Sequence, residues 1–462
     1  MVALALLAIV ALTLPSILGA SGAVRLGMHA VSASIFCLGF ARHDFPVRYV
    51  VTALLLILVL RISRDAQPRV RAHARTWVAV LLPLAIAVGV AARMGTISAG
   101  TADALFRYIA LVPSAVLYGY LLAKTRQTGA FGRAYVTWAG AMALWAVVES
   151  SVGHTLVAGA DIQVSLVRDG QFRAIGLSEH PILLGLQIAV AVAFVLNDGA
   201  RRWNSKVVFV AVLLSGIWAT GSRGALALAL GYLVAAGLYR TGFARLLRGK
   251  VLAASAVLAF GVGLVAVPFA VAALGEQGIA SADAAQASAE YRLVLYSRIA
   301  GAVADRPLGW GLEGLPIGQL VVDSPFGQKD LAYTVDSEIA LLAFDAGVLG
   351  LLGFAVLAAL VAVRALQGVA FASASALILV AGSFVAIHAW TIFPILFAVL
   401  VGAILSGPDG RAVVSVSDSP ELAKPRRAWG RNPTMSRTER SMARRARLET
   451  PSPTPRSIRV PE

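Results

Sequence analysis

The sequence predicts an all-α polytopic membrane protein with about 12 or 13 transmembrane helices. Of its 462 residues, 58% are hydrophobic and only 14% are charged, whereas a soluble protein carries about 25% charged residues. Long apolar runs recur from the first residues to Leu405. The net charge of +16 resides mainly in connections between these runs, which is a signal of membrane topology and not of nucleic-acid binding.

Each predicted helix corresponds to an apolar run that approaches the length needed to cross a bilayer, roughly 20 residues. In chain order the runs are Val2–Leu18, Val24–Phe40, Val50–Leu60, Trp77–Ala92, Ala104–Leu122, Tyr135–Val152, Pro181–Leu196, Val207–Ala219, Ala225–Tyr239, Val251–Leu274, Ser337–Val363, Val369–His388 and Trp390–Leu405. The first run is followed by Ala-Ser-Gly-Ala, which is similar to a cleavage site. It lacks a basic n-region and further helices follow at once, so we interpret it as a membrane segment.

Basic residues occupy every second connection from Arg61 onward. They are Arg61, Arg64, Arg69, Arg71 and Arg75, then Lys124, Arg126 and Arg133, then Arg201, Arg202 and Lys206, and finally Arg240, Arg245, Arg248 and Lys250. Because cytoplasmic loops carry the excess of Lys and Arg, we assign these connections to the cytoplasm. The connections 93–101, 153–180, 220–223 and 275–335 then face outward. Arg42 and Arg48 go against this assignment, since the same count places them outside.

The longest polar interval, residues 275–335, separates two helical parts of the chain. It holds seven acidic residues against four basic ones, a balance that agrees with an outward position. We therefore divide the chain into an N-terminal transmembrane bundle (1–274), a large extracytoplasmic loop (275–335), C-terminal transmembrane helices (336–406) and a basic tail (407–462). The tail is rich in Pro, Ser, Thr and Arg, and we predict that it is disordered and cytoplasmic.

The chain offers few residues for thiol or metal chemistry. Its one cysteine, Cys37, lies in an apolar run, and its six histidines are scattered along the sequence. An intrachain disulfide and a cysteine metal site are thereby excluded. The sequence also has no phosphate-binding glycine loop of the nucleotide type. We predict no metal, no cofactor and no nucleic-acid partner.

Arg223 is the most informative single residue. It lies in the turn Gly221-Ser222-Arg223-Gly224-Ala225, at the outer ends of two predicted helices. An arginine near the bilayer is costly, by about 2.5–3.5 kcal/mol at a helix centre and less near the interface. Its side chain either snorkels to the outer headgroups or binds an anion. The small residues around it leave room for a bulky anion to approach the backbone, which favours anion binding.

Two further arginines, Arg173 and Arg292, fall in outward connections. Taken singly, each is typical of an ordinary surface arginine in a polar loop. Three arginines on one face of the membrane are able to converge on a diphosphate, because the guanidinium fork matches phosphate oxygens and keeps its charge at any relevant pH.

Three residues are candidates for a role toward an acceptor hydroxyl: His180, Asp336 and Glu338. His180 precedes Pro181 at a helix start, so it either serves helix entry or forms a hydrogen bond to an acceptor. Asp336 and Glu338 open the next apolar helix, where acidic residues are favoured by the helix dipole. The functional alternative is a general base, which needs a carboxylate or imidazole within hydrogen-bond reach of the proton it takes.

These outward clusters together resemble the O-antigen ligase and polysaccharide polymerase (Wzy-type) family of bacterial envelopes. The matching pieces are Arg173…His180-Pro181, the turn Gly221–Ala225, the run Tyr291-Arg292-Leu293 with Arg306-Pro307-Leu308-Gly309-Trp310-Gly311, and Ala346-Gly347-Val348-Leu349-Gly350. The resemblance covers roughly residues 172–354. Each piece is short, and the specificity lies in their order and in their place in the topology.

The resemblance implies a metal-independent, inverting glycosyltransferase in the bacterial cytoplasmic membrane, with its active site facing outward. Its donor is a glycan on undecaprenyl diphosphate, and its partners are that donor, a glycan acceptor and membrane lipids. Carried over to this chain, the diphosphate-binding residues are Arg173, Arg223 and Arg292, of which the last two match better. Asp336, Glu338 or His180 act on the acceptor. A chain-length regulator is a further candidate partner, which the sequence does not identify.

One departure from the family pattern separates its two branches. The ligases usually have His-Asn where this chain has Asp336-Ser337, and acidic residues at this place are similar to the polymerase branch. The resemblance therefore favours polymerisation of lipid-linked repeat units, for O-antigen, capsule or exopolysaccharide, over ligase-type transfer to another acceptor. A transporter or flippase for an anionic lipid or sugar and a membrane scaffold are the alternatives from other classes. Transporters commonly have internal inverted repeats, and this sequence has no evident one.

Overall fold

The structure is a computed structural model of the chain. It describes residues 15–37, 45–94, 99–157, 166–168, 170–178, 180–240, 291, 295–296, 298–299, 301–311, 314–324, 327–331, 335, 337–367, 369–387, 390 and 393–406. The chain divides into two compact units, residues 1–412 and 413–462, and every described residue belongs to the first. Most of the predicted run Val2–Leu18, the run Val251–Leu274, the first part of the loop 275–335 (residues 275–290) with several shorter stretches of it, and the tail 407–462 lie outside the described residues.

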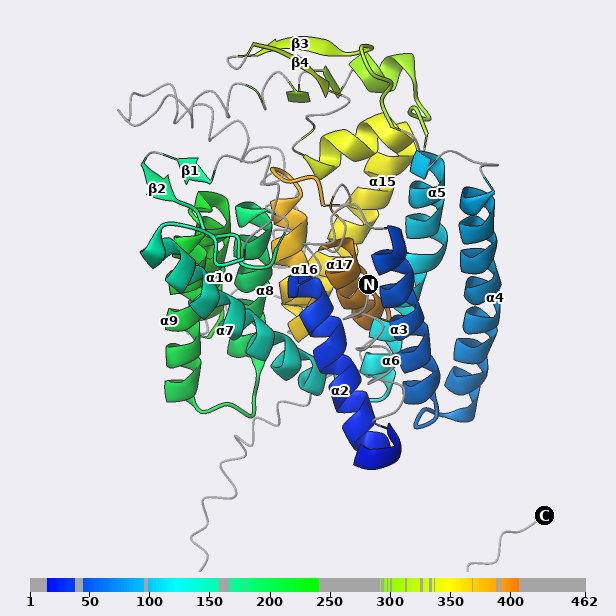
Figure 1. Cartoon of the computed structure of the whole chain (residues 1–462), viewed down its shortest axis with the longest axis vertical. Helices are drawn as coiled ribbons and strands as arrows, with labels where there is room; N and C mark the ends of the chain where they lie inside the picture. Colours follow the sequence, from blue (N-terminus) through cyan, green and yellow to red (C-terminus); the bar gives the residue numbers. More distant parts are fainter. Residues whose placement is uncertain are drawn as a thin grey trace, which may run out of the picture. The chain divides into compact units, whose positions relative to one another are not determined.

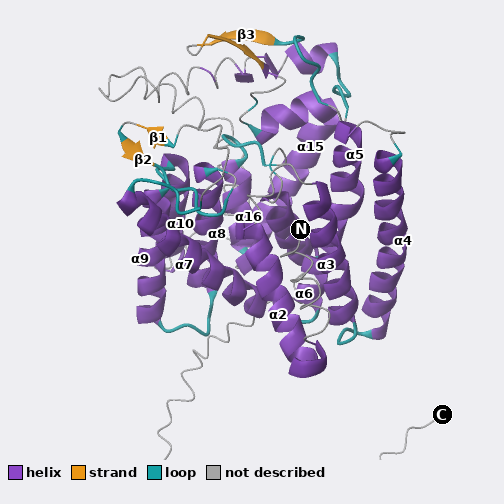
Figure 2. Ribbon diagram, in the orientation of Figure 1, coloured by secondary structure: helices purple, strands orange, loops and turns teal. Residues whose placement is uncertain are grey.

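The described part of the chain is mostly helical (Figures 1 and 2). Its helices are α2 (Pro15–Cys37), α3 (Phe45–Ser63), α4 (Pro68–Arg93), α5 (Ala99–Phe106), α6 (Val112–Lys124), α7 (Thr128–Val152), α8 (Pro181–Asn197), α9 (Trp203–Ala219), α10 (Arg223–Arg240), α15 (Glu338–Leu366), α16 (Ala370–Ala381) and α17 (Phe393–Leu405). The helical class predicted from the sequence is thus confirmed for these segments.

Several helices extend beyond the predicted apolar runs. The run Val50–Leu60 lies inside α3 and the run Trp77–Ala92 lies inside α4, because a helix continues into polar residues where the chain leaves an apolar layer. By length and composition, Pro68–Val88, Ala104–Lys124 and Glu338–Leu366 are able to cross a membrane, and shorter apolar helices accompany them in the described residues. These helices fit a multi-pass membrane protein.

The predicted run Ala104–Leu122 contains a change of helix type. α5 passes through a π-helical turn, Arg107–Leu111, directly into α6. A π-turn inserts an extra residue into the helical repeat and occurs frequently at functional sites. Here it places Arg107 and Tyr108, two polar residues, within an otherwise apolar rod.

Two short antiparallel hairpins were not predicted from the sequence, which indicated an all-α protein. β1 (Val167–Arg168) pairs with β2 (Gln171–Phe172), and β3 (Val321–Ser324) pairs with β4 (Gly327–Asp330). Both lie in the long connections that were predicted as loops. A connection of this length has backbone N–H and C=O groups that need partners, and pairing with its own chain provides them.

The connections sort into two ends of the helical unit (Figure 1). The α3–α4, α6–α7 and α8–α9 connections, which carry the basic residues, lie at the lower end of the view, and the two hairpins lie at the upper end. This separation agrees with the alternation predicted from the basic connections. The upper end is therefore the one predicted to face outward.

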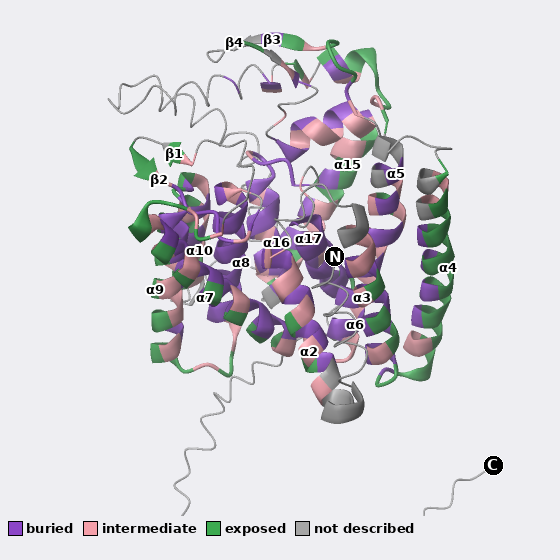
Figure 3. Cartoon of the chain, viewed as in Figure 1, coloured by how far each residue is buried: buried purple, intermediate pink, exposed green. Residues whose placement is uncertain are grey.

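α8 forms the centre of one half of the unit. It packs against α7, α9, α10 and α16, and its residues from Leu183 to Leu196 are buried. By contrast, α4 presents Trp77, Val80, Leu84 and Ile86 at the surface, and Figure 3 shows exposed residues along its length. An exposed apolar helix face is suited to contact with lipid chains.

α6 and α17 approach each other closely beside this centre. A Cβ atom on Gly119 would overlap the backbone of Val399, and one on Gly402 would overlap the backbone of Val116. Small residues at helix interfaces let backbones come together in a membrane, where van der Waals packing drives helix association. α17 is thereby fixed against the rod that carries the π-turn.

Candidate functional site

A cavity of about 800 Å³ opens at the hairpin end of the helical unit. The residues that line it, called here the arginine pocket, are Ser150, Gly153, Val167, Gly170, Gln171, Phe172, Arg173, Ile217, Trp218, Gly221, Ser222, Arg223 and Leu226. They come from the end of α7, the β1–β2 hairpin and the α9–α10 turn. Two of the three arginines predicted to bind a diphosphate, Arg173 and Arg223, therefore lie in one cavity.

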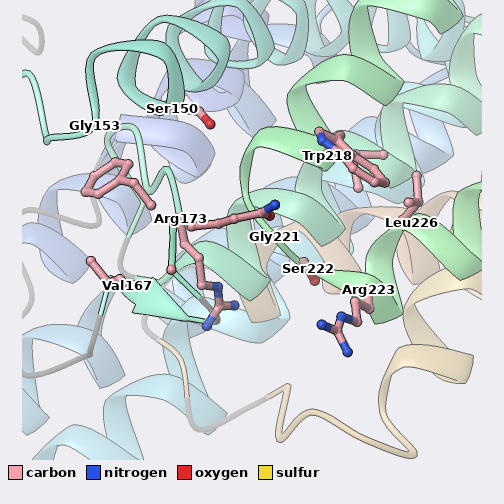
Figure 4. A pocket seen from close by; sticks show the side chains of 13 residues that line it. Ser150, Gly153, Val167, Arg173, Trp218, Gly221, Ser222, Arg223 and Leu226 are labelled. Carbon is pink, nitrogen blue, oxygen red and sulfur yellow. The ribbon is translucent and has the colours of Figure 1, made fainter. Parts of the chain in front are cut away.

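Arg223 is the first residue of α10 and its side chain is exposed. The preceding Ser222 accepts a hydrogen bond from the backbone N–H of Ala225 at 3.4 Å, through its Oγ, as a helix N-cap does. The following Gly224 packs against the ring of Phe384, 2.9 Å from where its Cβ would lie. Arg223 thus lines the pocket together with Gly221 and Ser222 of the same turn, and its guanidinium group extends away from the turn (Figure 4).

Arg173 is held differently, because it is buried, with 7% of its surface exposed. Its Nε donates a hydrogen bond to the carbonyl oxygen of Thr220 at 3.2 Å. Gly221, at φ 61°, passes so close that its Cβ would lie 3.0 Å from Cγ of Arg173. A buried charge is stable only when hydrogen-bonded or paired, and the α9–α10 turn supplies one such bond. Figure 4 shows the guanidinium groups of Arg173 and Arg223 directed to the same side of this turn.

The α9–α10 turn is itself rigidly bonded. The Thr220 hydroxyl donates to the carbonyl of Ile217 at 2.7 Å and accepts from the N–H of Ser222 at 3.2 Å. On α8, a Cβ at Gly185 would lie 3.0 Å from Thr220, Ser222 and Ala225, so helix and turn are in direct contact. The position of Arg223 and the carbonyl that binds Arg173 are thus set by the same short turn that the sequence singled out.

The pocket also has an apolar wall. Trp218 is 70% exposed, and Phe172, Ile217 and Leu226 also line the cavity. A cavity lined by two cations and by several apolar side chains is suited to a ligand that has an anionic part and a hydrophobic part. Tryptophan is enriched at membrane interfaces for the same reason, since its ring is apolar and its N–H is polar.

The third predicted arginine, Arg292, and the predicted base Asp336 lie outside the described residues. Glu338 is described: it is the first residue of α15 and is 7% exposed. Its backbone N–H donates to the carbonyl of Gly382 at 2.8 Å, and the Ser337 hydroxyl caps the helix by accepting from the N–H of Ala340 at 3.4 Å. Glu338 does not line the arginine pocket.

Glu338 lies within the range of charge interactions of Tyr108 on the π-turn, as do Arg107 and Asp345. We call these four residues the second polar cluster. Arg107 and Tyr108 come from the π-turn between α5 and α6, and the acidic residues Glu338 and Asp345 come from α15. Ionisable residues inside apolar segments are costly and mark functional positions. The structure thus provides Glu338 with polar neighbours that sequence reasoning did not identify.

His180 caps α8. Its Nδ1 accepts a hydrogen bond from the N–H of Ile182 at 3.1 Å, and its ring lies 5.5 Å from that of Trp390. Because Nδ1 is used as an acceptor, the neutral ring carries its proton on Nε2 and offers a donor there. The helix-entry role considered for His180 is therefore present in the structure, and a role toward an acceptor stays a prediction.

The other two sequence motifs meet each other in what we call the glycine joint, residues 307–311 against 344–348. α15 is interrupted at Gly347, which has φ 56° and ψ −135°. Across the interruption, Trp310 N–H donates to the carbonyl of Phe344 at 2.8 Å, and Val348 N–H donates to that of Pro307 at 2.9 Å. Helical carbonyls and amides that have lost their own partners are thus satisfied by the loop.

Sequence reasoning missed three ionisable residues near these sites: Arg107, Asp345 and Glu149. Each one lies within an apolar helix, and that placement was a signal in the sequence itself. Glu149 lies directly before Ser150, which lines the arginine pocket. Among the described residues, no group of three or more His, Cys, Asp or Glu side chains is placed to hold a metal ion.

Comparison with known proteins identifies one family. Residues 208–355 match the model of a family described as O-antigen ligase, which confirms the resemblance drawn from the sequence over this range. The match includes Arg223, Glu338 and the glycine joint, whereas Arg173 and His180 precede it. No curated protein and no solved structure matches the chain.

Proposed function

With an O-antigen ligase family domain at residues 208–355 as the premise, we propose that this chain is a membrane glycosyltransferase that polymerises glycan repeat units carried on undecaprenyl diphosphate. The reaction takes place at the outer face of the cytoplasmic membrane. The observation that carries the proposal is the arginine pocket, where Arg173 and Arg223 line one cavity together with an apolar wall that includes Trp218.

The pocket is proposed to hold the donor. A diphosphate placed between Arg173 and Arg223 would accept charge-assisted hydrogen bonds, which are about twice as strong as neutral ones. The first part of the lipid chain would follow Trp218 and Leu226 toward the bilayer. The side chain of Arg173 is held by the Thr220 carbonyl and the backbone of Arg223 by the capped start of α10, which limits the reorganisation needed when the diphosphate arrives.

In the proposed reaction, an acceptor hydroxyl attacks the anomeric carbon of the donor sugar. A bond forms between the acceptor oxygen and that carbon, the bond from carbon to diphosphate oxygen breaks, and undecaprenyl diphosphate leaves. A single displacement of this kind inverts the anomeric configuration. The two arginines stabilise the charge that grows on the leaving diphosphate, where fixed cations lower the barrier most.

The proton of the acceptor hydroxyl is proposed to pass to Glu338 or Asp336. The position of Glu338 supports this role, since it is a buried carboxylate at the start of α15 within the range of charge interactions of Tyr108. Glu338→Gln and Asp336→Asn are expected to separate the two acids. The variant that lacks the base loses turnover while its affinity for the lipid-linked donor is retained, and near-normal turnover in both variants contradicts a carboxylate base.

The proposal favours polymerisation over transfer to a different acceptor because Asp336-Ser337 stands where the ligases usually have His-Asn. In a polymerase the acceptor is the end of another lipid-linked repeat unit. Ligase-type transfer to a separate acceptor is the second candidate, and the family match supports either one.

Reconstitution tests the proposal. The purified chain is placed in vesicles with a labelled undecaprenyl-diphosphate-linked oligosaccharide, and the glycan length and released lipid diphosphate are measured. A polymerase produces a ladder of longer glycans and one undecaprenyl diphosphate per bond formed. A ligase transfers one glycan only when a separate acceptor is added. Movement of the glycan across the membrane without lengthening would identify a transporter instead. If the glycan is neither lengthened nor moved, the scaffold alternative is supported.

A further inference from the structure

Glu149 is a buried carboxylate that the proposed reaction does not use. It lies near the end of α7, has no exposed surface and does not line the arginine pocket. An ionised carboxylate away from water is costly unless its oxygens are hydrogen-bonded. The hydrogen-bond partners of this carboxylate therefore indicate its structural role.

Each oxygen of Glu149 accepts two hydrogen bonds. Oε1 accepts from Nε1 of Trp145 and from the backbone N–H of Leu156, both at 3.1 Å. Oε2 accepts from the backbone N–H groups of Ile175 at 3.1 Å and Gly176 at 2.8 Å. A carboxylate has about four lone-pair positions, so the four donors match its full capacity.

These bonds hold both ends of one segment of the chain. Leu156 precedes the segment 157–174 and Ile175 follows it, so a single carboxylate closes its base. The segment contains the β1–β2 hairpin and contributes Val167, Phe172 and Arg173 to the pocket. Whatever fixes residues 156, 175 and 176 therefore fixes the part of the pocket wall that carries Arg173.

Arg173 is two residues from the nearest of these anchors. Between them, the N–H of Ala174 donates to the carbonyl of Ala219 at 3.0 Å, and Nε of Arg173 donates to the carbonyl of Thr220 at 3.2 Å. The backbone after Arg173 is thus bonded first to the end of α9 and then to Glu149. The direction of the buried guanidinium group depends on both connections.

We propose that Glu149 is a positioning residue that holds Arg173 at the phosphate site. The inference rests on the proposed function for the identity of the ligand, a lipid diphosphate, but the placement of Arg173 can be measured without it. In the variant Glu149→Gln, the new amide would have the same shape as the carboxylate and only one acceptor oxygen. Whichever way that amide turned, its NH2 group would face two N–H donors, so the substitution breaks half of the clamp without changing the volume of the side chain.

The test compares Glu149→Gln with the matched control Lys206→Met in the full chain. Lys206 is likewise buried, and its Nζ donates to the carbonyl of Leu196 at 3.0 Å, but it lies at the other end of α9. We measure the rate at which phenylglyoxal modifies Arg173, with the exposed Arg223 as an internal reference, and the hydrogen exchange of residues 156, 175 and 176. Glu149→Gln is expected to raise the Arg173 rate toward that of Arg223 and to speed exchange, whereas Lys206→Met changes neither.

The functional arm uses farnesyl diphosphate as a short prenyl diphosphate probe. Glu149→Gln is expected to weaken its binding about tenfold, the loss of roughly one charge-assisted hydrogen bond, and to raise the KM for the lipid-linked donor more than it lowers kcat. Adding Arg173→Ala to Glu149→Gln should then produce no loss beyond that of Arg173→Ala alone. Additive losses would overturn the inference, because Glu149 would act through something other than Arg173.

Unchanged modification of Arg173 in Glu149→Gln would also overturn the inference. If Glu149→Gln does not accumulate in the membrane, Glu149→Asp replaces it, since a shorter carboxylate reaches one pair of donors and the expected changes keep the same direction. If wild-type protein fails to bind farnesyl diphosphate or to extend glycans, the proposed function is wrong. The Arg173 modification rates then still decide whether Glu149 positions that arginine.

Discussion

The arginine pocket and the glycine joint use glycine for opposite purposes. In the pocket, Gly221 makes room for the stem of a side chain, Arg173, beside an open cavity. In the joint, Gly309 and Gly347 make room for backbone. A Cβ on Gly347 would overlap the carbonyl oxygen of Pro307, and one on Gly309 would overlap that of Asp345. Space in the pocket is open and is proposed to take a ligand, whereas space in the joint is already filled by the protein.

The two regions should therefore respond differently to substitution. Changes in the joint remove hydrogen bonds between α15 and its loop, so they should lower stability and leave little protein to assay. Changes in the pocket alter the cations and the open cavity, so they should lower activity while the protein still folds. Substitutions of matched size in each region test this difference.

The largest effect is expected for Gly347→Ala. At φ 56° and ψ −135° an alanine costs about 1–3 kcal/mol for a positive-φ backbone conformation that side chains rarely adopt, and overlap with Pro307 adds about 1–3 kcal/mol of overpacking. We expect a sharp fall in membrane-inserted protein and in thermal stability, measured by fluorescence-detected size exclusion after heating. Gly353→Ala is the control, because it lies in the same helix and a Cβ there has nothing within 4 Å. Equal stability of the two variants would contradict the prediction that close backbone packing at Gly347 stabilises the protein.

Arg223→Lys should have the next largest effect, on activity alone. If the side chain only snorkels to headgroups, lysine replaces it well. If it binds a diphosphate, the planar fork matters, and losing one charge-assisted hydrogen bond costs about 1.5–3 kcal/mol, or roughly 10- to 150-fold in turnover. We expect a well-expressed, strongly impaired Arg223→Lys and an inactive Arg223→Ala in the glycan-ladder assay. Arg202→Lys, an exposed arginine at the start of α9, should behave like wild type. Full turnover by Arg223→Lys would support the snorkelling alternative.

Gly221→Ala should combine the effects expected in the two regions, a loss of stability and a loss of donor binding. Its φ of 61° costs about 1–2 kcal/mol in an alanine, and the new Cβ would press on Cγ of Arg173 at 3.0 Å. Gly318→Ala places an alanine at a positive φ of 80° in open space, so it reports the backbone cost alone. We expect similar losses of thermal stability in the two variants but a raised donor KM only in Gly221→Ala. A KM unchanged from wild type would mean that the turn does not place Arg173.

Sequence reasoning identified the helices and both glycine motifs, but not how the motifs are used. Apolar runs predict membrane helices well because burial in an apolar layer decides them locally. The pairing of Gly309 with Gly347 could not be predicted, because it depends on where a loop returns in space. The burial of Arg173 likewise depends on the Thr220 carbonyl, 47 residues further along the chain. By resemblance to the family Arg173 was the weaker match, and the structure places it in the same cavity as Arg223.

Ionisable residues inside apolar helices are a signal in the sequence itself, because such residues are costly there unless they have partners. Arg107, Glu149 and Asp345 each interrupt a run that was treated as uniformly apolar. Their cost in such a place requires partners, and for Glu149 three of the four are backbone N–H groups, of Leu156, Ile175 and Gly176, beside the indole N–H of Trp145. Backbone N–H groups cannot be recognised as partners from the sequence. The hydrogen bonds that join Glu149 to the segment carrying Arg173 are therefore visible only in the structure.

The smallest effect is expected at His180, which belongs to neither region but begins the helix on which the pocket turn rests. Its Nδ1 accepts from the N–H of Ile182, and loss of an N-cap costs about 1 kcal/mol. His180→Ala should therefore lower thermal stability slightly, whereas His180→Asn, which restores a capping oxygen, should not. His154→Ala, on an exposed loop residue, controls for loss of the ring. If His180 also acts on the acceptor, asparagine cannot replace its chemistry, so a stable His180→Asn with strongly reduced turnover would assign the ring a role in the reaction, and normal turnover would limit it to the helix cap.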